Sequence, residues 1–163
     1  MSVLAHPKIL SLQALRRKLA PLRAAGKTIV FTNGCFDILH PGHVDLLARA
    51  KAHGDILIVG LNADLSVKRL GKGDDRPFTP CAARAFVLAH LESVDFVIAF
   101  DEDTPLRLIQ AIRPHVLVKG GDWTPENIVG SDVVAKNGGR TLSLPLLGNW
   151  STTKLAMKIR EIG

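Results

Sequence analysis

The chain has 163 residues, of which 47% are hydrophobic, and 21 basic against 15 acidic residues give it a formal net charge of +6. This length and composition predict one globular domain with a sizeable core and exclude a disordered chain. Two cysteines exclude a disulfide framework, and the lack of any run of about 20 apolar residues excludes a membrane-spanning helix. The first residues lack the long apolar run of a secretory signal, and the two isolated cysteines suit a reducing compartment. The positive charge suits an acidic ligand.

The first predicted element is an amphipathic helix in an N-terminal segment, residues 1–26, whose leucines recur every three or four positions. Pro21 is expected to disturb this helix. The remainder, residues 27–163, is expected to form the main unit of what is a single domain overall. The leucines of the helix are Leu12, Leu15, Leu19 and Leu22.

Strands and helices alternate through the main unit. The sequence predicts five strands, at residues 28–31, 55–61, 94–100, 116–118 and 141–144, and the apolar, β-branched runs of the first two are typical of buried strands. The helices predicted between them are one that begins at Pro41 and ends at Gly54, one at 82–91 with Thr79 as N-cap, one from Thr104 to Pro114, one that Ser131 caps, and a last one from Ser151 toward Ile162. This alternation predicts an α/β, Rossmann-like three-layer fold with a five-stranded parallel sheet.

Ligands of parallel sheets bind outside the carboxyl ends of the strands. The segments that follow the predicted strands carry glycines, hydroxyl groups and cations, which predicts a site for an anionic ligand at this edge. No GxGxxG run follows the first strand, which disfavours a dinucleotide-dependent dehydrogenase. After the second strand come residues 62–64 and a basic loop, after the fourth strand residues 119–123, and after the fifth strand residues 148–154.

The segment after the first strand, FTNGCFDILHPGH at residues 31–43, is the most informative. Its glycines let a ligand approach the backbone, and the helix that begins at Pro41 offers free N–H groups to an anion. His40 and His43 lie three positions apart, so on a helix they share one face and can donate to the same phosphate. They could instead be half of a zinc site, but Cys35 and Cys81 are too isolated to complete one. We therefore expect no metal held by protein side chains.

A nucleoside triphosphate and a second phosphate would account for these groups together. The two histidines would donate at the α-phosphate, and Lys68 would close in from a loop at residues 67–78 whose glycines permit movement. The hydroxyl groups of 151–153 would hold the other phosphates, with Mg²⁺ bridging them. No general base is needed, because a phosphate nucleophile with a second pKa of about 6 is already ionised. Asp37 and Asp64 would bind sugar hydroxyls or cap turns, while Lys72 and Arg84 would face phosphates or solvent.

At this point the chain resembles a known family. The segment TNGCFDILHPGH, Lys68-Arg69, Arg76-Pro77, the EDTP run at 102–105, the KGGD run at 119–122 and the Ser-Thr-Thr run at 151–153 occur in the same order in D-glycero-β-D-manno-heptose 1-phosphate adenylyltransferases. These belong to the cytidylyltransferase-like superfamily of HxGH nucleotidyltransferases. The resemblance implies that residues 27–163 are a nucleotidyltransferase domain in a stand-alone form, without the kinase domain to which many relatives are fused.

The resemblance also implies an activity and its partners. AMP would pass from ATP to heptose 1-phosphate, giving ADP-heptose and pyrophosphate for lipopolysaccharide core or other surface glycans. The enzyme would use Mg²⁺ and form a cytoplasmic homodimer, with no nucleic-acid or membrane partner. The implied catalytic residues are His40, His43 and Lys68; the implied nucleotide-binding residues are Thr32, Asn33, Gly34, Cys35, Phe36, Gly42, Lys119, Gly121, Asp122, Ser151, Thr152 and Thr153; the implied substrate-binding residues are Asp37, Asp64, Lys72, Arg84 and Trp123.

One departure from related families leaves alternatives open. Relatives that transfer cytidylyl groups to glycerol phosphate carry an Arg-Thr-Glu-Gly run before the Ser-Thr-Thr run. Here residues 147–150 are Leu-Gly-Asn-Trp, which leaves Lys154, Lys119 and Arg84 as candidates to replace the arginine. Trp150 is bulkier than the residue expected there. The alternatives are a cytidylyltransferase acting on glycerol 3-phosphate and a non-catalytic nucleotide-binding domain; an RNA-binding module is disfavoured because aromatic residues are sparse.

Overall fold

The structure is a computed structural model that describes residues 4–71, 73 and 75–162. Lys72, which the sequence placed among the substrate-binding residues, lies outside the described residues. Within the described part of the chain, no helix is both long and apolar enough to cross a membrane.

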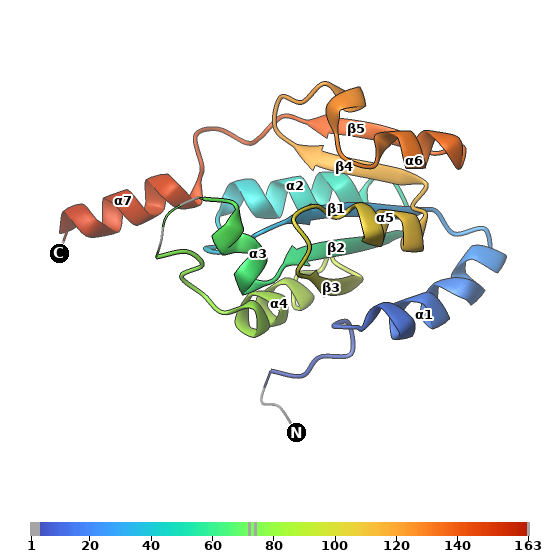
Figure 1. The fold of residues 1–163 in the computed structure, drawn as a ribbon, viewed down its shortest axis with the longest axis horizontal. Coiled ribbons are helices and arrows are strands. Elements are labelled where there is room, and N and C mark those ends of the chain that lie inside the picture. The colour runs from blue at the N-terminus through green and yellow to red at the C-terminus, as the bar shows by residue number, and fades with distance from the viewer. Residues whose placement is uncertain (1–3, 72, 74, 163) are drawn as a thin grey trace.

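Five parallel strands form one sheet in the order β3-β2-β1-β4-β5 (Figure 1). This confirms the predicted α/β class and the number of strands. The central strand β1 pairs with β2 on one side and β4 on the other, so that Thr32 lies between Val59 and Val118. The topology reverses at β1, and such reversal points are where open parallel sheets bind ligands. The strands are β1 (Ile29–Gly34), β2 (Ile56–Asn62), β3 (Phe96–Phe100), β4 (Val116–Gly120) and β5 (Arg140–Leu144).

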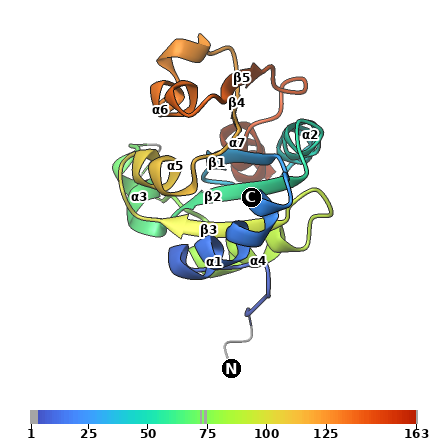
Figure 2. The same cartoon turned by 90° about the vertical axis from the view of Figure 1, so that its right-hand side faces the viewer.

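Helices cover both faces of the sheet and give the predicted three layers (Figure 2). One core cluster joins the sheet to α2 (Pro41–Lys51) and α4 (Cys81–Ala89). The other joins it to α1 (Leu12–Ala24), α5 (Leu106–Ile112) and α6 (Ser131–Lys136). Successive residues of β1 point to opposite faces, so Val30 belongs to the first cluster and Phe31 to the second. The remaining elements are α3 (Asp64–Arg69), a 3-10 turn (Pro125–Asn127) and α7 (Thr152–Ile162).

The N-terminal helix is part of this core. Leu15 and Leu19 are buried in the second cluster, and α1 continues through Pro21 instead of ending there. Ser11 caps α1 by accepting a hydrogen bond from the Ala14 N–H at 3.3 Å.

Several predicted helix ends differ from the structure. Pro41 is the first residue of α2 as predicted, but the helix ends at Lys51 and its C-cap is Ala52 instead of Gly54. Packing explains the glycine at position 54 instead, since a Cβ there would lie 2.7 Å from Cγ2 of Val30. Pro80 takes the N-cap position of α4 that was predicted for Thr79, and Gly130, with φ of 89°, takes the position predicted for Ser131.

The last helix starts as the sequence indicates. The Ser151 hydroxyl accepts a hydrogen bond from the Lys154 N–H at 3.2 Å, which is the contact of an N-cap serine. Beyond this point α7 projects away from the sheet (Figure 1). Thr152 is its one buried residue among those described.

Candidate active site

The first part of the site is the junction between β1 and α2. β1 ends at Gly34, the backbone turns through Phe36 with φ of 46°, and His40 is the extended N-cap of α2. The imidazole rings of His40 and His43 stack at the start of the helix, with centroids 3.7 Å apart and planes 18° apart. The predicted shared face therefore exists, at a helix N-terminus that attracts anions.

The histidine pair is enclosed by small and aromatic neighbours. A Cβ on Gly42 would lie 3.2 Å from Nδ1 of His40 and 3.3 Å from Cβ of Trp150, so only glycine leaves both where they are. The Trp150 ring lies parallel to His40, with centroids 6.5 Å apart, and Phe36 lies 5.1 Å from the His43 ring. Trp150 thus brings the start of α7 beside the histidines.

His40 is set up to act as a neutral hydrogen-bond donor. It is 8% exposed, and its Nδ1 is buried without a hydrogen-bond partner among the described residues. Burial lowers the pKa of His40 below its usual value, because the charged imidazolium is poorly solvated. A neutral imidazole still donates one N–H to a phosphate oxygen.

The hydroxyl groups of residues 151–153 differ in exposure. Thr152 is buried, and its hydroxyl points to the carbonyl oxygen of Ile38 at 3.5 Å. Ser151 is half-buried and caps α7, whereas Thr153 is exposed. The structure therefore places these residues beside the β1–α2 junction, with Thr153 the most accessible of them.

The second part of the site is a hollow of about 380 Å³ at the carboxyl ends of β1, β2 and β4. Its walls include Asn33, Gly34 and Cys35 of the β1 turn, which the sequence predicted. They also include Asn62 and Thr104, to which the sequence assigned no role. The sequence identified Glu102–Pro105 as part of the family motif. The structure shows in addition that this loop lies beside the β1 turn in the wall of the hollow. Neither His40 nor His43 lines the hollow. The β1 turn lies between the histidine pair and the hollow and connects these two parts of the site.

The end of β4 and the loop that follows it supply another wall of the hollow. Lys119 and Trp123 line it, and Trp123 is half-exposed while its indole N–H donates to the Gly120 carbonyl oxygen at 3.1 Å. Gly121 has φ of 116°, a conformation that favours glycine, and Asp122 is exposed. The structure thus brings the 119–123 segment to the hollow, with Trp123 on its surface.

The predicted roles of Asp37 and Arg84 in substrate binding do not fit the structure. The Asp37 side chain is fully buried, and its oxygens accept from Arg76 Nε at 2.6 Å, Phe78 N at 3.0 Å and Thr79 N at 2.9 Å. The Arg84 side chain is also fully buried. Both side chains are inaccessible to a ligand because protein groups surround them.

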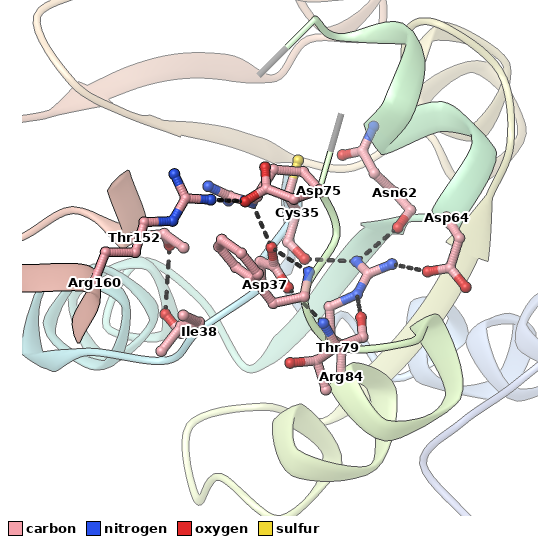
Figure 3. A network of polar contacts seen from close by, with 12 residues as sticks. Cys35, Asp37, Ile38, Asn62, Asp64, Asp75, Thr79, Arg84, Thr152 and Arg160 are labelled. Carbon is pink, nitrogen blue, oxygen red and sulfur yellow. Dashed lines mark hydrogen bonds and ion pairs between the residues drawn. The ribbon is translucent and has the colours of Figure 1, made fainter. Parts of the chain in front are cut away.

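Arg84 instead joins the carboxyl ends of two strands (Figure 3). Its guanidinium donates to the carbonyl oxygens of Cys35 at 2.6 Å and Asn62 at 2.8 Å, and to Asp64 at 2.6 Å. Asp64 keeps 43% of its side chain exposed, since Arg84 and the Cys81 N–H both use the same oxygen, Oδ1. Asp64 therefore remains able to reach a ligand.

Lys68 lies on a helix and not in the predicted loop. The short helix α3 includes Val67, Lys68 and Arg69, and the Lys68 side chain is exposed with no ion pair to another described residue. Its neighbour Arg69 pairs with Asp103 at 2.7 Å, which ties α3 to the loop after β3. In the part of the chain that the structure describes, no group of three His, Cys, Asp or Glu residues is placed to hold a metal ion.

Comparison with known proteins gives the family. Residues 31–137 match the family model described as Cytidylyltransferase-like. The chain belongs to the cytidylyltransferase-like family. This match covers the β1–α2 junction, α3, the hollow and α6, while Trp150 and residues 151–153 at the start of α7 lie outside it.

Curated relatives of this family member are longer proteins. The bifunctional protein HldE of Geotalea uraniireducens is 53% identical over 160 residues, which cover 96% of this chain and 32% of the relative. The bifunctional protein HldE of Rhodopseudomonas palustris is 61% identical over 143 residues, which cover 88% of this chain and 29% of the relative. The chain thus spans about a third of the length of these relatives.

Solved structures share the fold. A lipopolysaccharide core biosynthesis protein from Thermoplasma volcanium superposes with a TM-score of 0.62 at 25% identity, covering 75% of this chain and 98% of that protein. A pantoate-beta-alanine ligase from Francisella tularensis superposes with a TM-score of 0.54 at 16% identity, covering 94% of this chain and 77% of the ligase. The second likeness concerns the fold alone.

Proposed function

We propose that this chain is a nucleotidyltransferase that moves AMP from ATP to D-glycero-β-D-manno-heptose 1-phosphate. The observation that carries the proposal is the stacked pair His40 and His43 at the N-terminus of α2, directly beyond the turn that lines the hollow. The motif resemblance supplies the heptose phosphate, and the name of the Thermoplasma volcanium protein points to the same pathway. The 53–61% identity to proteins named HldE supports it.

In the proposed reaction, an oxygen of heptose 1-phosphate attacks the α-phosphorus of ATP. The bond between this phosphorus and the oxygen bridging to the β-phosphate breaks, and pyrophosphate leaves with that oxygen. His40 and His43 donate hydrogen bonds to the α-phosphate oxygens, where negative charge develops. Lys68 is exposed on α3 and would add positive charge. No side chain has to accept a proton from the nucleophile, because the attacking phosphate is ionised at neutral pH.

The remaining groups of the site are proposed to hold the two ligands. Thr153 and the start of α7 would bind the β- and γ-phosphates. Asp64 and Trp123 would contact the sugar, and the backbone of Asn33 to Phe36 the nucleotide. Lys119, Gly121 and Asp122 would complete the nucleotide site beside the hollow.

Mg²⁺ is proposed to enter with the triphosphate, where it would neutralise charge on the phosphate oxygens. The donor set fits this arrangement, because Ser and Thr hydroxyls, a lysine and two histidines are phosphate ligands rather than a magnesium cage. We also propose a cytoplasmic homodimer. Its support, besides the family resemblance, is that α7 exposes Ile159 and Ile162, which lie three positions apart on one face of the helix and would be covered by a second subunit.

The test of the function is pyrophosphate release in the presence of Mg²⁺. ATP and CTP are each combined with heptose 1-phosphate and with glycerol 3-phosphate. We expect pyrophosphate release from only one of the four pairs, ATP with heptose 1-phosphate. Release with CTP and glycerol 3-phosphate would replace the proposed substrates, and ATP binding without release from any pair would identify a non-catalytic nucleotide-binding domain.

His43→Ala tests the role of the histidines. We expect kcat to fall about 100-fold or more while the dissociation constant for ATP changes little, because the hydrogen bond strengthens in the transition state. His53→Ala is the matched control, because His53 lies two residues after the end of α2. It should leave kcat and the dissociation constant for ATP unchanged. Equal losses in kcat and ATP affinity for His43→Ala would contradict the assigned role.

A further inference from the structure

A buried ion pair beneath the histidine junction has no part in the proposed reaction. Asp37 lies between β1 and α2, three residues before His40, and its side chain is 0% exposed. Its partner Arg76 is 6% exposed and comes from the segment between α3 and α4. Taking two charges out of water is unfavourable unless the geometry and the additional hydrogen bonds are good. This pair therefore calls for an explanation beyond filling space.

One carboxylate holds a whole segment of chain. We define the residues 75–79 as the arm. Asp37 accepts the Arg76 guanidinium and also the backbone N–H groups of Phe78 and Thr79. Arg76 lies over the Phe78 ring, with its guanidinium carbon 4.9 Å from the ring centroid. These contacts fix the backbone of the arm, and not only one side chain, to the start of the histidine junction.

The end of the arm nearest α4 is held a second time. The Thr79 carbonyl oxygen accepts a hydrogen bond from Arg84 Nε at 2.8 Å, and the same guanidinium binds the carbonyl oxygens at the ends of β1 and β2. The arm is thus attached to the carboxyl edge of the sheet by two independent charged groups (Figure 3). Its position relative to the site is determined by Asp37 and Arg84 together.

Helix α7 depends on the same region for its own placement. Near its first turn the Thr152 hydroxyl contacts the carbonyl oxygen of Ile38, the residue after Asp37. Near its last turn Arg160 forms an ion pair with Asp75, the first residue of the arm. Since Thr152 is the one buried residue of α7 among those described and the helix projects from the domain, these two ties attach the helix near its two ends (Figure 1).

We infer that Asp37 and Arg76 are positioning residues, which align the phosphate-binding start of α7 with the histidine pair through the arm. This inference rests on the proposed function. Asp37 holds the arm, the arm holds Arg160, and Ile38 beside Asp37 holds Thr152. Loss of the Asp37 charge therefore releases α7 from one side of the site, while His40 and His43 keep their own helix. The effect on activity arises from misalignment of ATP and not from loss of a group that touches it.

The chain offers a matched control for the main variant. Asp95 also accepts a lysine and a backbone amide, Lys51 Nζ at 2.5 Å and Leu57 N at 2.7 Å, but it lies at the amino ends of the strands. Asp37→Asn and Asp95→Asn each remove one carboxylate charge of this kind. Both are expected to lower the melting temperature, so a difference in kinetics between them separates positioning from stability.

Kinetics with ATP are measured well below the lower of the two melting temperatures. We expect kcat/KM for ATP to fall about 10-fold to 100-fold in Asp37→Asn, since a misplacement of about 1 Å has effects of this size. Asp95→Asn should stay within about twofold of the wild type, because distant sites act independently. Similar losses in both variants would overturn the inference and leave a structural role for the pair.

The exposed tie gives a second test that does not threaten folding. Arg160→Asp places two like charges at the contact and should raise KM for ATP about threefold to fivefold. The charge swap Asp75→Arg with Arg160→Asp should return KM to within about twofold of the wild type, which a purely local effect of either residue would not do. An unchanged KM in Arg160→Asp would also overturn the inference.

Hydrogen exchange separates failure of this inference from failure of the proposed function. Asp37→Asn should speed amide exchange in the arm and at the start of α7, and Asp95→Asn should not. This measurement needs no substrate. If the wild-type chain released no pyrophosphate from any pair but showed this exchange pattern, the proposed reaction would fail and the positioning would stand. Unchanged exchange in Asp37→Asn would remove the positioning, whatever the activity.

Discussion

Gly42 combines packing and chemistry in one position of α2. The space that a Cβ would need is taken by Nδ1 of His40 at 3.2 Å and Cβ of Trp150 at 3.3 Å. These contacts are tighter than ordinary van der Waals contacts, so one of the two neighbours has to shift when the methyl group is added. His40 belongs to the stacked pair and Trp150 leads into α7, so either shift changes the proposed phosphate site.

Gly42→Ala is therefore expected to affect activity more than stability. Alanine favours a helix by about 1 kcal/mol over glycine, which offsets part of the crowding. We expect kcat for pyrophosphate release to fall about tenfold, while the urea midpoint changes little. Ala48→Gly, at an exposed position of the same helix, is the matched control: it should lower stability by about 1 kcal/mol and leave kcat unchanged. Full activity in Gly42→Ala would show that the site tolerates the shift.

At the residue scale, the sequence predicted the neighbourhood of the site better than the role of each side chain. The stacked histidines and the β1 turn follow from a local motif. Asp37 and Arg84 were assigned to ligands because a charged residue after a strand or at the start of a helix looks the same whether it faces a ligand or a protein partner. Their partners lie 39 and 49 positions away, at Arg76 and Cys35, which no local pattern reveals.

At the scale of elements, strands were easier to predict than helix ends. The inner strands β1 and β2 contain continuous apolar runs because they are buried on both faces, and burial leaves a clear signal in sequence, whereas the edge strand β5 is only partly buried. Helix ends depend on backbone geometry and on neighbours far along the chain. Gly54 illustrates this, since its lack of a side chain serves the contact with Val30 and not a cap. The six-residue helix α3 was missed for lack of a recognisable apolar period, which moved Lys68 from a loop onto a helix.

One side chain links two elements at the centre of the sheet. His115, immediately before β4, accepts a hydrogen bond from the Ile29 N–H of β1 through Nδ1 at 2.8 Å. Burial lowers the pKa of His115, and the nearby Arg23 charge lowers it further. Protonation of Nδ1 would also remove the acceptor for the β1 amide. The native state therefore favours the neutral imidazole.

This arrangement predicts a loss of stability in mild acid. The pKa of His115 is lower in the folded state than in the unfolded state, where it is about 6.5, so the unfolded chain binds more protons below that pH. Stability should consequently fall as the pH drops from about 7 toward 5, and buried His40 should contribute in the same direction. Asp55, whose pKa is lowered by its hydrogen bond from the Thr28 amide, acts only at lower pH.

His115→Asn provides the measurement. Asparagine can offer an oxygen to the Ile29 N–H but does not titrate. Melting temperatures at pH 5.5 and 7.5 should differ less in this variant than in the wild type. Parallel curves for the two proteins would show that His115 does not contribute to the acid sensitivity, which would then lie with the other histidines.

At the scale of the whole molecule, the strand order makes β3 and β5 the edges of the sheet. Residues before α1 cover the β3 edge. The Leu10 N–H donates to the Val97 carbonyl oxygen at 3.0 Å, and the Val97 N–H donates to the Lys8 carbonyl oxygen at 2.9 Å. Lys8 also donates through its side chain to the Val94 carbonyl oxygen at 2.6 Å. This cover occupies the N–H and carbonyl groups of Val97, through which the edge strand would pair with another chain.

Removal of residues 1–10 should expose this edge without altering the site. We expect a loss of at least about 2–3 kcal/mol in the free energy of unfolding from two backbone hydrogen bonds and those of Lys8, to which the lost packing of Ile9 and Leu10 against the core adds. The truncated chain should also aggregate more as its concentration rises, because β3 then presents free N–H and carbonyl groups. Urea unfolding and light scattering measure the two effects. Lys8→Ala, which keeps the backbone pairing, should lose less stability and remain monodisperse to the same degree as the wild type.

The position of residues 8–10 on the β3 edge determines the expected effect of their removal on pyrophosphate release. Val97 is the second residue of β3, near the amino end of the strand, whereas the histidine pair and the hollow lie at the carboxyl ends of the strands. Pyrophosphate release per folded molecule should therefore be unchanged in the truncated chain. A truncated chain that stayed folded but lost kcat would show that the edge and the site are coupled through the sheet. An unchanged urea midpoint would show instead that residues 8–10 add no stability to the edge.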